Sequence, residues 1–306
     1  MLNFKTIDIN CKQEIDEYLK NYNYIGTEGT FFVLFCWRYL FNFKYATEDG
    51  FLFITLKFQD RISYLFPIGE DNSEDKNATK EAVKKIIKNA EEQNIPFYLI
   101  ALDDERKELL ESIFPEKFNF AEDRNNYDYV YNQNDLQLLT GKKFHAQRNH
   151  INKFNLLYQN YKVEPITKKS FYECMEMNLE WCKANGLNTA SICSGNNYEL
   201  CAVNQAFGNF DALGCIGTLI RINDKVIAFT LGSERNKDVF VTHFEKALYE
   251  YDGAFKVINQ EYAKVLGGYN YKFINREEDM GDEGLRHSKM SYNPAFMVKK
   301  YNAEIR

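Results

Sequence analysis

The order in which helix and strand patterns follow one another constrains this chain more than any other feature. In the second half, an amphipathic pattern over Ser170–Ala184 precedes three apolar segments that are separated by short polar turns. The segments are Ile216–Ile222, Val226–Gly232 and Val239–Phe244. Turns of two or three residues join antiparallel neighbours, so these segments are expected to form a meander.

A second helix follows the meander. Its apolar residues Phe255, Ile258, Tyr262 and Val265 share one face, Asp252 is expected to cap its start, and Gly267-Gly268 is expected to end it. The remaining predicted elements are a strand over Tyr271–Ile274, a short helix over Gly284–Lys289 and a last strand over Ala295–Tyr301.

The first half repeats this order without an obvious repeat of sequence. Its predicted helices cover Glu14–Leu19, Phe31–Phe41, Lys80–Gln93 and Asp104–Ile113, and its strands cover Phe51–Phe58, Ile62–Pro67, Pro96–Ala101, the region near Phe118 and Tyr127–Tyr131. Helix, meander, helix, strand, helix, strand is the order of the GNAT acyltransferase fold. We therefore predict an α/β (α+β) chain of tandem GNAT-like domains at 1–134 and 135–306, each a mixed, mostly antiparallel sheet flanked by helices.

Composition limits the functional classes. A net charge of −6 argues against a protein that binds nucleic acid over its whole surface, so any contact with RNA is expected to be local. The seven cysteines include no C-x-x-C pair, which favours reduced thiols and a cytoplasmic protein. The longest apolar segment, Phe31–Phe41, contains Arg38 and is shorter than the roughly 20 residues that cross a bilayer, so no integral membrane segment is expected.

A basic block at the predicted domain junction indicates a local site for a polyanion. No acidic residue occurs from Leu139 to Tyr161, and the block carries four cations, namely Lys142, Lys143, Arg148 and Lys153. The alternative is a solvated helix face. His145 and His150 are five residues apart and do not share a helical face, so no metal site is expected.

The start of the second helix of the C-terminal half disfavours an acyl-CoA donor without excluding it. Acetyl-CoA enzymes of this fold hold the pyrophosphate on backbone N–H groups of a glycine-rich turn at that position. Here Glu250 and Asp252 would repel a pyrophosphate, and Phe255 occupies the position of a small residue.

Two segments carry candidate catalytic side chains. His243, Glu245 and Lys246 lie at the end of the central strand, where alternation places Lys246 on the opposite face from the other two. A surface ion pair beside a packed histidine is the alternative interpretation.

The second segment is the acidic loop and short helix after Ile274. Asp279 is a candidate base or a ligand for a substrate ammonium, and Arg286 and Lys289 are candidates to bind one anionic group together. Tyr292 adds a hydroxyl group. The alternative is a solvated turn with scattered ion pairs.

Three strings of this sequence resemble the soluble proteins that are grouped with the C-terminal domain of bacterial phosphatidylglycerol lysyltransferases. The strings are Leu139–Phe154, His243–Ala247 and Phe273–Pro294. The resemblance implies two GNAT-like domains, similar to the Fem peptidyltransferases, and an aminoacyl group moved from a charged tRNA to a lipid hydroxyl. By position it implicates Glu245, Lys246, Asp279, Arg286, Lys289 and Tyr292. The membrane-spanning half of the full lysyltransferase is not in this sequence, so a phosphatidylglycerol acceptor is not implied.

The leading hypothesis is a cytoplasmic acyltransferase, with peripheral contact at the inner membrane face as an option, that moves an aminoacyl group from tRNA to an amine or hydroxyl. Glu245 or Asp279 would take the proton or hold the aminoacyl ammonium, Arg286 and Lys289 would bind phosphate or oxyanion, and the basic block would guide the acceptor stem. No cofactor is required, and the acceptor is a lipid, a peptide or another small molecule. The alternatives are an acyl-CoA-dependent N-acetyltransferase and a non-catalytic GNAT-like module that binds a ligand or RNA.

Overall fold

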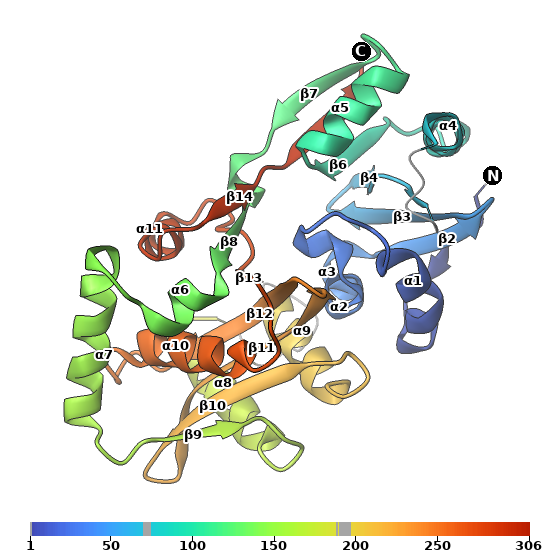
Figure 1. Cartoon of the computed structure of the whole chain (residues 1–306). Helices are drawn as coiled ribbons and strands as arrows, with labels where there is room; N and C mark the ends of the chain where they lie inside the picture. Colours follow the sequence, from blue (N-terminus) through green and yellow to red (C-terminus); the bar gives the residue numbers. More distant parts are fainter. Residues whose placement is uncertain (1, 70–74, 188, 190–196) are drawn as a thin grey trace. The chain divides into compact units, whose positions relative to one another are not determined.

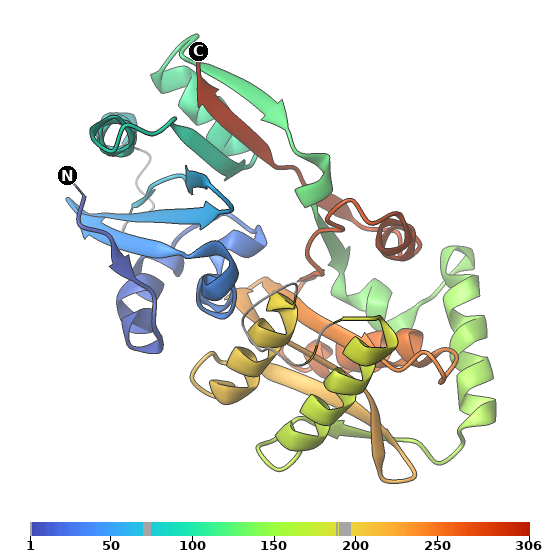
Figure 2. The same cartoon turned by 180° about the vertical axis from the view of Figure 1, so that it is seen from behind.

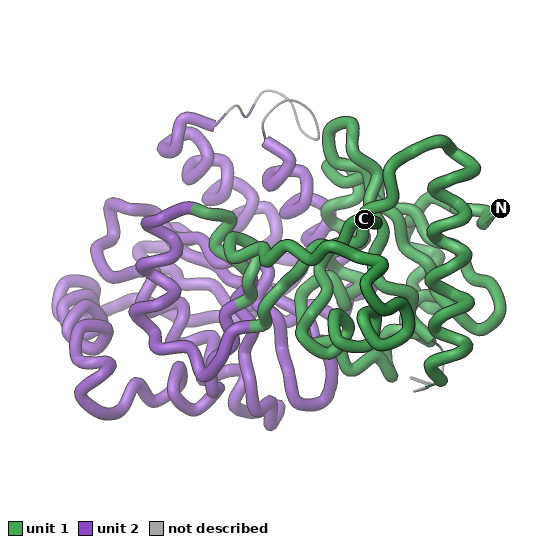
Figure 3. The backbone as a smooth tube through the Cα atoms, turned by 90° about the horizontal axis from the view of Figure 1, so that it is seen from above, with its two compact units in different colours: residues 1–128, 278–281, 298–306 green, residues 129–277, 282–297 purple. Residues whose placement is uncertain are grey.

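The computed structural model describes residues 2–69, 75–187, 189 and 197–306, which form two compact units (Figure 3). Unit 1 comprises Met1–Asp128, Glu278–Gly281 and Val298–Arg306, and unit 2 comprises Tyr129–Glu277 and Asp282–Met297. In the described part of the chain, none of the helices combines the length and the apolar composition needed to cross a membrane.

An eight-stranded sheet forms the centre of unit 1, in the order β1-β2-β3-β4-β6-β15-β7 with β5 paired to β3. Its strands are β1 (Lys5–Thr6), β2 (Lys44–Glu48), β3 (Phe51–Phe58), β4 (Arg61–Tyr64), β5 (Ile68–Gly69), β6 (Tyr98–Leu102), β7 (Phe118–Glu122) and β15 (Tyr301–Ile305). The helices of this unit are α1 (Lys12–Leu19), α2 (Phe31–Cys36), α3 (Arg38–Phe41), α4 (Lys76–Glu92) and α5 (Asp104–Ile113). The single helix predicted over Phe31–Phe41 is thus divided at Trp37, whose ψ of 5° leaves the helical range.

A seven-stranded sheet forms unit 2, in the order β14-β8-β13-β12-β11-β10-β9. The strands are β8 (Asp128–Asn132), β9 (Lys162–Pro165), β10 (Ile216–Ile222), β11 (Lys225–Asn236), β12 (Val239–Ala247), β13 (Phe273–Asn275) and β14 (Phe296–Val298). The predicted meander is β10, β11 and β12, and it pairs antiparallel throughout.

The helices of unit 2 cover both faces of its sheet. They are α6 (Gln133–Leu138), α7 (His145–Leu157), α8 (Phe171–Ala184), α9 (Tyr198–Gly208), α10 (Ala254–Gly267) and α11 (Glu283–Met290). In unit 2, α10 lies on one face of the sheet and α8 and α9 lie on the other, as Figures 1 and 2 show from opposite sides. The core beneath α10 contains the buried side chains of Ile220, Phe240, Ile258 and Tyr262.

Two predicted details differ from the structure. The N-cap position predicted for Asp252 is occupied by Gly253, with a φ of 91°, and Asp252 forms an ion pair with Lys153. The last predicted strand is two strands, of which β15 pairs with β6 and β7 in unit 1. β15 therefore belongs to unit 1, although all of unit 2 precedes it in the sequence. Strand pairing between residues so distant along the chain leaves no local pattern from which it could be predicted.

The thiols depart in part from the prediction. Cys11, Cys36, Cys174, Cys182 and Cys215 form no disulfide, whereas Cys201 is disulfide-bonded. The remaining cysteine, Cys193, lies outside the described residues.

Candidate active site in unit 2

The second sheet opens where β12 and β13 part. The two strands pair in parallel only as far as Val241 with Asn275, although β12 continues to Ala247. Just beyond the last pair, His243 is the extra residue of a β-bulge. Opposite the bulge, a Cβ on Gly232 would lie 1.9 Å from the Val241 carbonyl oxygen, so only glycine fits there. Beyond this point, side chains at the ends of the two strands span the gap between β12 and β13.

A buried ion pair bridges the opening. Arg276, which directly follows β13, donates from Nη2 to Glu245 Oε1 of β12 at 2.8 Å. The other carboxylate oxygen, Oε2, accepts from Asn259 Nδ2 of α10 at 2.9 Å. The Glu245 and Arg276 side chains are 13% and 10% exposed, so this pair is largely removed from water. Removal of one partner from such a pair leaves an uncompensated charge, which costs several kcal/mol.

Two aromatic rings lie beside the guanidinium group, and a lysine lies against one of these rings. The Arg276 Cζ lies 5.0 Å from the ring centroid of Tyr292 and 5.6 Å from that of Tyr131. Lys256 Nζ lies 4.6 Å from the same Tyr292 ring. Burial raises the pKa of Tyr292, so its phenol stays protonated and can donate a hydrogen bond. We refer to Glu245, Lys256, Asn259, Arg276 and Tyr292 as the Glu245 cluster.

Three buried atoms of this cluster have no hydrogen-bond partner within the part of the chain that the structure describes. They are Arg276 Nη1, the Tyr292 hydroxyl oxygen and Asn259 Oδ1. Buried polar atoms are almost always satisfied, so each is suited to bind a water molecule or a polar group of a ligand. The site therefore offers two donors and one acceptor beside a carboxylate.

Lys289 of α11 supports this cluster. Its Nζ donates to the backbone carbonyl of Arg276 at 2.5 Å, and its own carbonyl accepts from the Tyr131 hydroxyl at 2.8 Å. The Lys289 side chain is buried, which suits a positioning role for the Arg276 backbone. Arg286, on the same helix, is half-buried. The sequence prediction that Arg286 and Lys289 bind one anion together stays a prediction.

Asp279 lies in unit 1, not in unit 2. It is fully buried, its Oδ2 lies 3.3 Å from Arg124 Nη1, and its Oδ1 accepts from the backbone N–H of Gly281 at 2.8 Å. These contacts are typical of a carboxylate that holds a loop. Its predicted action as a base stays a prediction.

Lys246 lies on the opposite face of β12 from Glu245, as strand alternation indicates. Its Nζ lies 3.5 Å from the Trp181 ring centroid and 2.7 Å from Glu199 Oε1. Trp181, interpreted from sequence as a core aromatic, is half-buried and stacks on this lysine. Glu245 and Lys246 therefore do not enter the same cluster.

His243 lies between a serine and a glutamate. Its Nε2 is 2.8 Å from Ser233 Oγ, and its Nδ1 is 2.7 Å from Glu277 Oε1. Burial lowers the pKa of His243 to about 3, so the ring is neutral near pH 7. A neutral ring that donates to Glu277 and accepts from Ser233 ties β11 to the chain that leaves β13.

Stability is expected to fall with acidification because of His243. The unfolded histidine binds a proton below about pH 6.5, whereas the folded one does so only near pH 3. Between these values the unfolded state holds the extra proton, so the free energy of unfolding should fall by up to about 1.4 kcal/mol per pH unit. Urea unfolding of His243→Gln and of the exposed His287→Gln, from pH 7 to pH 4, measures this effect. An unchanged pH dependence in His243→Gln would contradict it.

The basic block makes contacts within unit 2. Lys143 pairs with Asp135 at 2.8 Å and Lys153 with Asp252 at 2.6 Å, and Arg148 donates to backbone carbonyls that include that of Gly141. Lys142 is exposed. Exposed ion pairs contribute about 0–1 kcal/mol, so these contacts leave the lysines available to a stronger anion. The predicted polyanion site stays a prediction.

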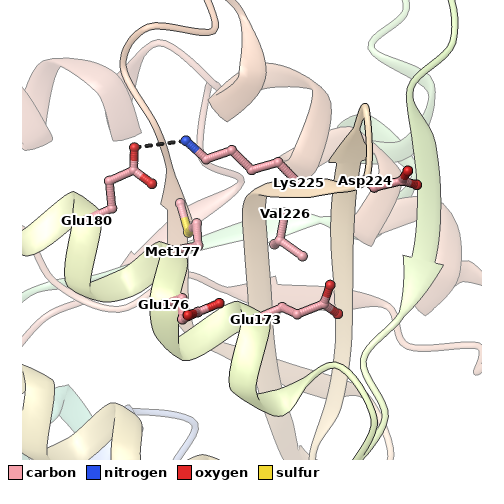
Figure 4. A pocket seen from close by; sticks show the side chains of 7 residues that line it. All are labelled: Glu173, Glu176, Met177, Glu180, Asp224, Lys225 and Val226. Atoms are coloured by element: carbon pink, nitrogen blue, oxygen red, sulfur yellow. Dashed lines mark hydrogen bonds and ion pairs between the residues drawn. The ribbon is translucent and has the colours of Figure 1, made fainter.

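A cavity of about 300 Å³ lies between α8 and the β10–β11 turn (Figure 4). Its lining residues are Glu173, Glu176, Met177, Glu180, Asp224, Lys225 and Val226. Glu180 pairs with Lys225 at 2.8 Å, drawn as a dashed line, and Glu173 pairs with Arg221 at 2.6 Å. Because no member of the Glu245 cluster lines it, this acidic cavity is separate from the candidate site.

The sheet order with its parted parallel pair defines the class of the protein: it has tandem GNAT-like domains, the architecture of acyltransferases. This confirms the fold predicted from the sequence. The chain belongs to the family described as phosphatidylglycerol lysyltransferase, C-terminal, whose model matches residues 20–304. Family and fold together are those of an acyltransferase.

Solved structures share this fold over nearly the whole chain. A conserved protein of unknown function from Bacteroides thetaiotaomicron is 36% identical, with a TM-score of 0.91 and 100% of both chains covered. The L-PGS of Bacillus licheniformis is 14% identical, with a TM-score of 0.64 over 96% of this chain and 91% of that one. FemX is 8% identical, with a TM-score of 0.62 over 100% of this chain and 98% of that one.

A curated relative matches a shorter region. An uncharacterized protein of Mycoplasmoides gallisepticum is 23% identical over 182 residues, which is 58% of this chain. The match spans 56% of that relative's length.

Three members of the cluster were not predicted from the sequence, namely Arg276, Asn259 and Lys256. Arg276 lies in the charged segment after Ile274, but nothing in the local sequence distinguishes it from the neighbouring charged residues. Asn259 is a polar residue beside Ile258 on the otherwise apolar buried face of α10, which is a usable signal for a buried amide. Lys256 has no such signal, because lysine is a common residue in helices.

Proposed function

We propose that this protein transfers an aminoacyl group from tRNA to an amine or hydroxyl acceptor at the Glu245 cluster. The observation that carries the proposal is the set of unpartnered buried atoms around the Glu245–Arg276 ion pair. Their chemistry matches an aminoacyl ester better than a simple acyl group.

The match follows from the hydrogen-bonding capacity of each group. The ester carbonyl oxygen can accept from Arg276 Nη1 and from the Tyr292 hydroxyl, and the α-ammonium can donate to Asn259 Oδ1. An acetyl group has no ammonium, so it would leave Asn259 Oδ1 buried and unsatisfied. The negative charge of Glu245 also favours a nearby ammonium.

The reaction needs little covalent chemistry from the protein. The acceptor attacks the ester carbon, negative charge develops on the carbonyl oxygen, and the ribose oxygen leaves. Arg276 and Tyr292 stabilise the developing oxyanion, and Glu245 and Lys289 hold Arg276 in position. No covalent intermediate on the protein is required.

The start of α10 supports a donor other than acyl-CoA. The N–H groups of Ala254, Lys256 and Val257 already donate to backbone carbonyls of the preceding turn. A Cβ on Gly253 would lie 2.8 Å from the carbonyl oxygen of His150 in α7, so α7 packs closely against this turn. A pyrophosphate would find few free N–H groups there.

The basic block supports tRNA as the carrier of the donor. Lys142, Lys143 and Lys153 are exposed on unit 2, and a polyanion can replace their weak surface ion pairs. Binding through such contacts weakens steeply as salt is added.

A charging assay tests the proposal. The protein is incubated with tRNA charged with labelled amino acids and with lipid, peptide or small-amine acceptors, and acetyl-CoA is the control donor. Label is expected to move from tRNA but not from acetyl-CoA. Binding of tRNA without transfer to any acceptor would support a non-catalytic module. Transfer from acetyl-CoA alone would show that the donor is an acyl-CoA. Either outcome would overturn the proposal.

A further inference from the structure

The Glu245 cluster needs a group that accepts the proton of the attacking acceptor, and Glu245 is poorly placed to be that group. Both of its carboxylate oxygens already accept hydrogen bonds, one from Arg276 and one from Asn259. Protonation would neutralise the partner of a buried guanidinium, which is costly. Glu245 is therefore better suited to position Arg276, and its catalytic role stays a prediction from the sequence.

Lys256 is another titratable group of the Glu245 cluster. It lies in the first turn of α10, and its Nζ lies 4.6 Å from the Tyr292 ring centroid. Arg276 lies over that same ring, with its Cζ 5.0 Å from the centroid. Lys256 and Arg276 thus both lie against the ring of Tyr292.

The surroundings of Lys256 favour its neutral form. Burial and the charge of Arg276 lower its pKa, and Glu245 acts more weakly in the opposite direction. Lys256 makes no ion pair with any residue that the structure describes. On the helices packed against α10, Asp135 of α6 pairs with Lys143, and Lys153 of α7 pairs with Asp252.

We propose that Lys256 is the general base of the transfer reaction. This inference rests on the proposed function. The neutral amine of Lys256 takes a proton from the attacking amine or hydroxyl as the new bond to the acyl carbon forms. The ester bond to the ribose oxygen then breaks, and the Lys256 ammonium returns the proton to that oxygen. Protons balance, and the protein ends the cycle unchanged.

Substitution of Lys256 tests the inference, with Lys264 as the matched control on the same helix. Lys264 pairs with Glu261 at 2.7 Å, and its side chain is 45% exposed. Lys256→Met, which keeps the apolar stem, is expected to lower kcat/KM about 10²-fold and to remove the rising limb of the pH profile. Lys256→Arg should not restore the rate, because guanidinium does not deprotonate. Lys264→Met should leave kcat/KM and the pH profile unchanged.

A second measurement does not depend on turnover. Brief acetic anhydride labelling over a pH series, read by mass spectrometry, gives the titration midpoint of each lysine in the unmodified protein. The midpoint of Lys256 is expected to lie below that of Lys264. Equal midpoints, or full activity of Lys256→Met, would overturn the inference and leave the proposed function intact. Absence of transfer by the unmodified protein would instead overturn the proposed function, and the inference with it.

Discussion

Arg276→Lys is expected to lower kcat/KM for aminoacyl transfer about 10³-fold. Lysine keeps a positive charge opposite Glu245, so the buried carboxylate stays compensated. It loses the second N–H group, Nη1, that the structure leaves without a partner. A point charge cannot pair with Glu245 and hold the oxyanion in the fixed geometry of a planar guanidinium. The substitution therefore removes the proposed oxyanion donor and keeps the positive charge that pairs with Glu245.

Arg221→Lys is the matched control for this prediction. Arg221 also pairs with carboxylates in unit 2, Glu164 and Glu173, but it lies on β10 outside the Glu245 cluster. The rate of Arg221→Lys should stay within about twofold of that of the unmodified protein, because Arg221 is not a member of the Glu245 cluster. Thermal unfolding shows whether both variants are folded. A folded Arg276→Lys that loses less than about tenfold would contradict the assignment of Arg276 as an oxyanion donor.

Lys300→Met is expected to lower the free energy of unfolding of unit 1 by about 3–5 kcal/mol. Lys300 is 1% exposed, and its Nζ lies 2.7 Å from Asp128 Oδ1 and 2.8 Å from Glu28 Oε1. Burial alone lowers the pKa of Lys300, but Asp128 and Glu28 outweigh it and raise the pKa above the ordinary value. The stabilisation is therefore complete at neutral pH and is lost only above about pH 10.4. Methionine fills the same space and leaves Asp128 without its cation.

Lys299→Met controls for the loss of a lysine from the same segment. Lys299 is exposed, so its replacement should change the free energy of unfolding by no more than about 0.5 kcal/mol. Urea unfolding, with hydrogen exchange read on β6 and β15, assigns the effect to unit 1. Equal stability of the two variants would show that the buried ion pair does not stabilise this unit.

Local patterns predicted most elements of this fold, because amphipathic and alternating periods survive in a single sequence. The meander of β10 to β12 and the helix α10 were both visible in this way. The return of the chain to unit 1 at β15 could not be predicted in this way, since β15 pairs with strands far from it along the chain. Pairing across such distances depends on the whole fold, and no window of residues encodes it.

The candidate site was predicted in part. Glu245 and Tyr292 lie in the cluster, and Lys289 holds the backbone of Arg276 beside it. Arg276 itself was hidden among neighbouring charges, because a sequence does not show where β12 and β13 part. Strand alternation predicted Lys246 on the opposite face from Glu245, and the structure places it there against Trp181.

The position of β15 has a consequence for synthesis. β15 lies between β6 and β7, so neither strand has its full set of neighbours until residues 301–305 have left the ribosome. During translation, the edges of β6 and β7 that pair with β15 stay exposed until β15 has been synthesised. Exposed strand edges promote aggregation. This protein is therefore expected to depend on chaperones during translation, and a truncation of β15 should leave the sheet incomplete however much of the remaining chain is present.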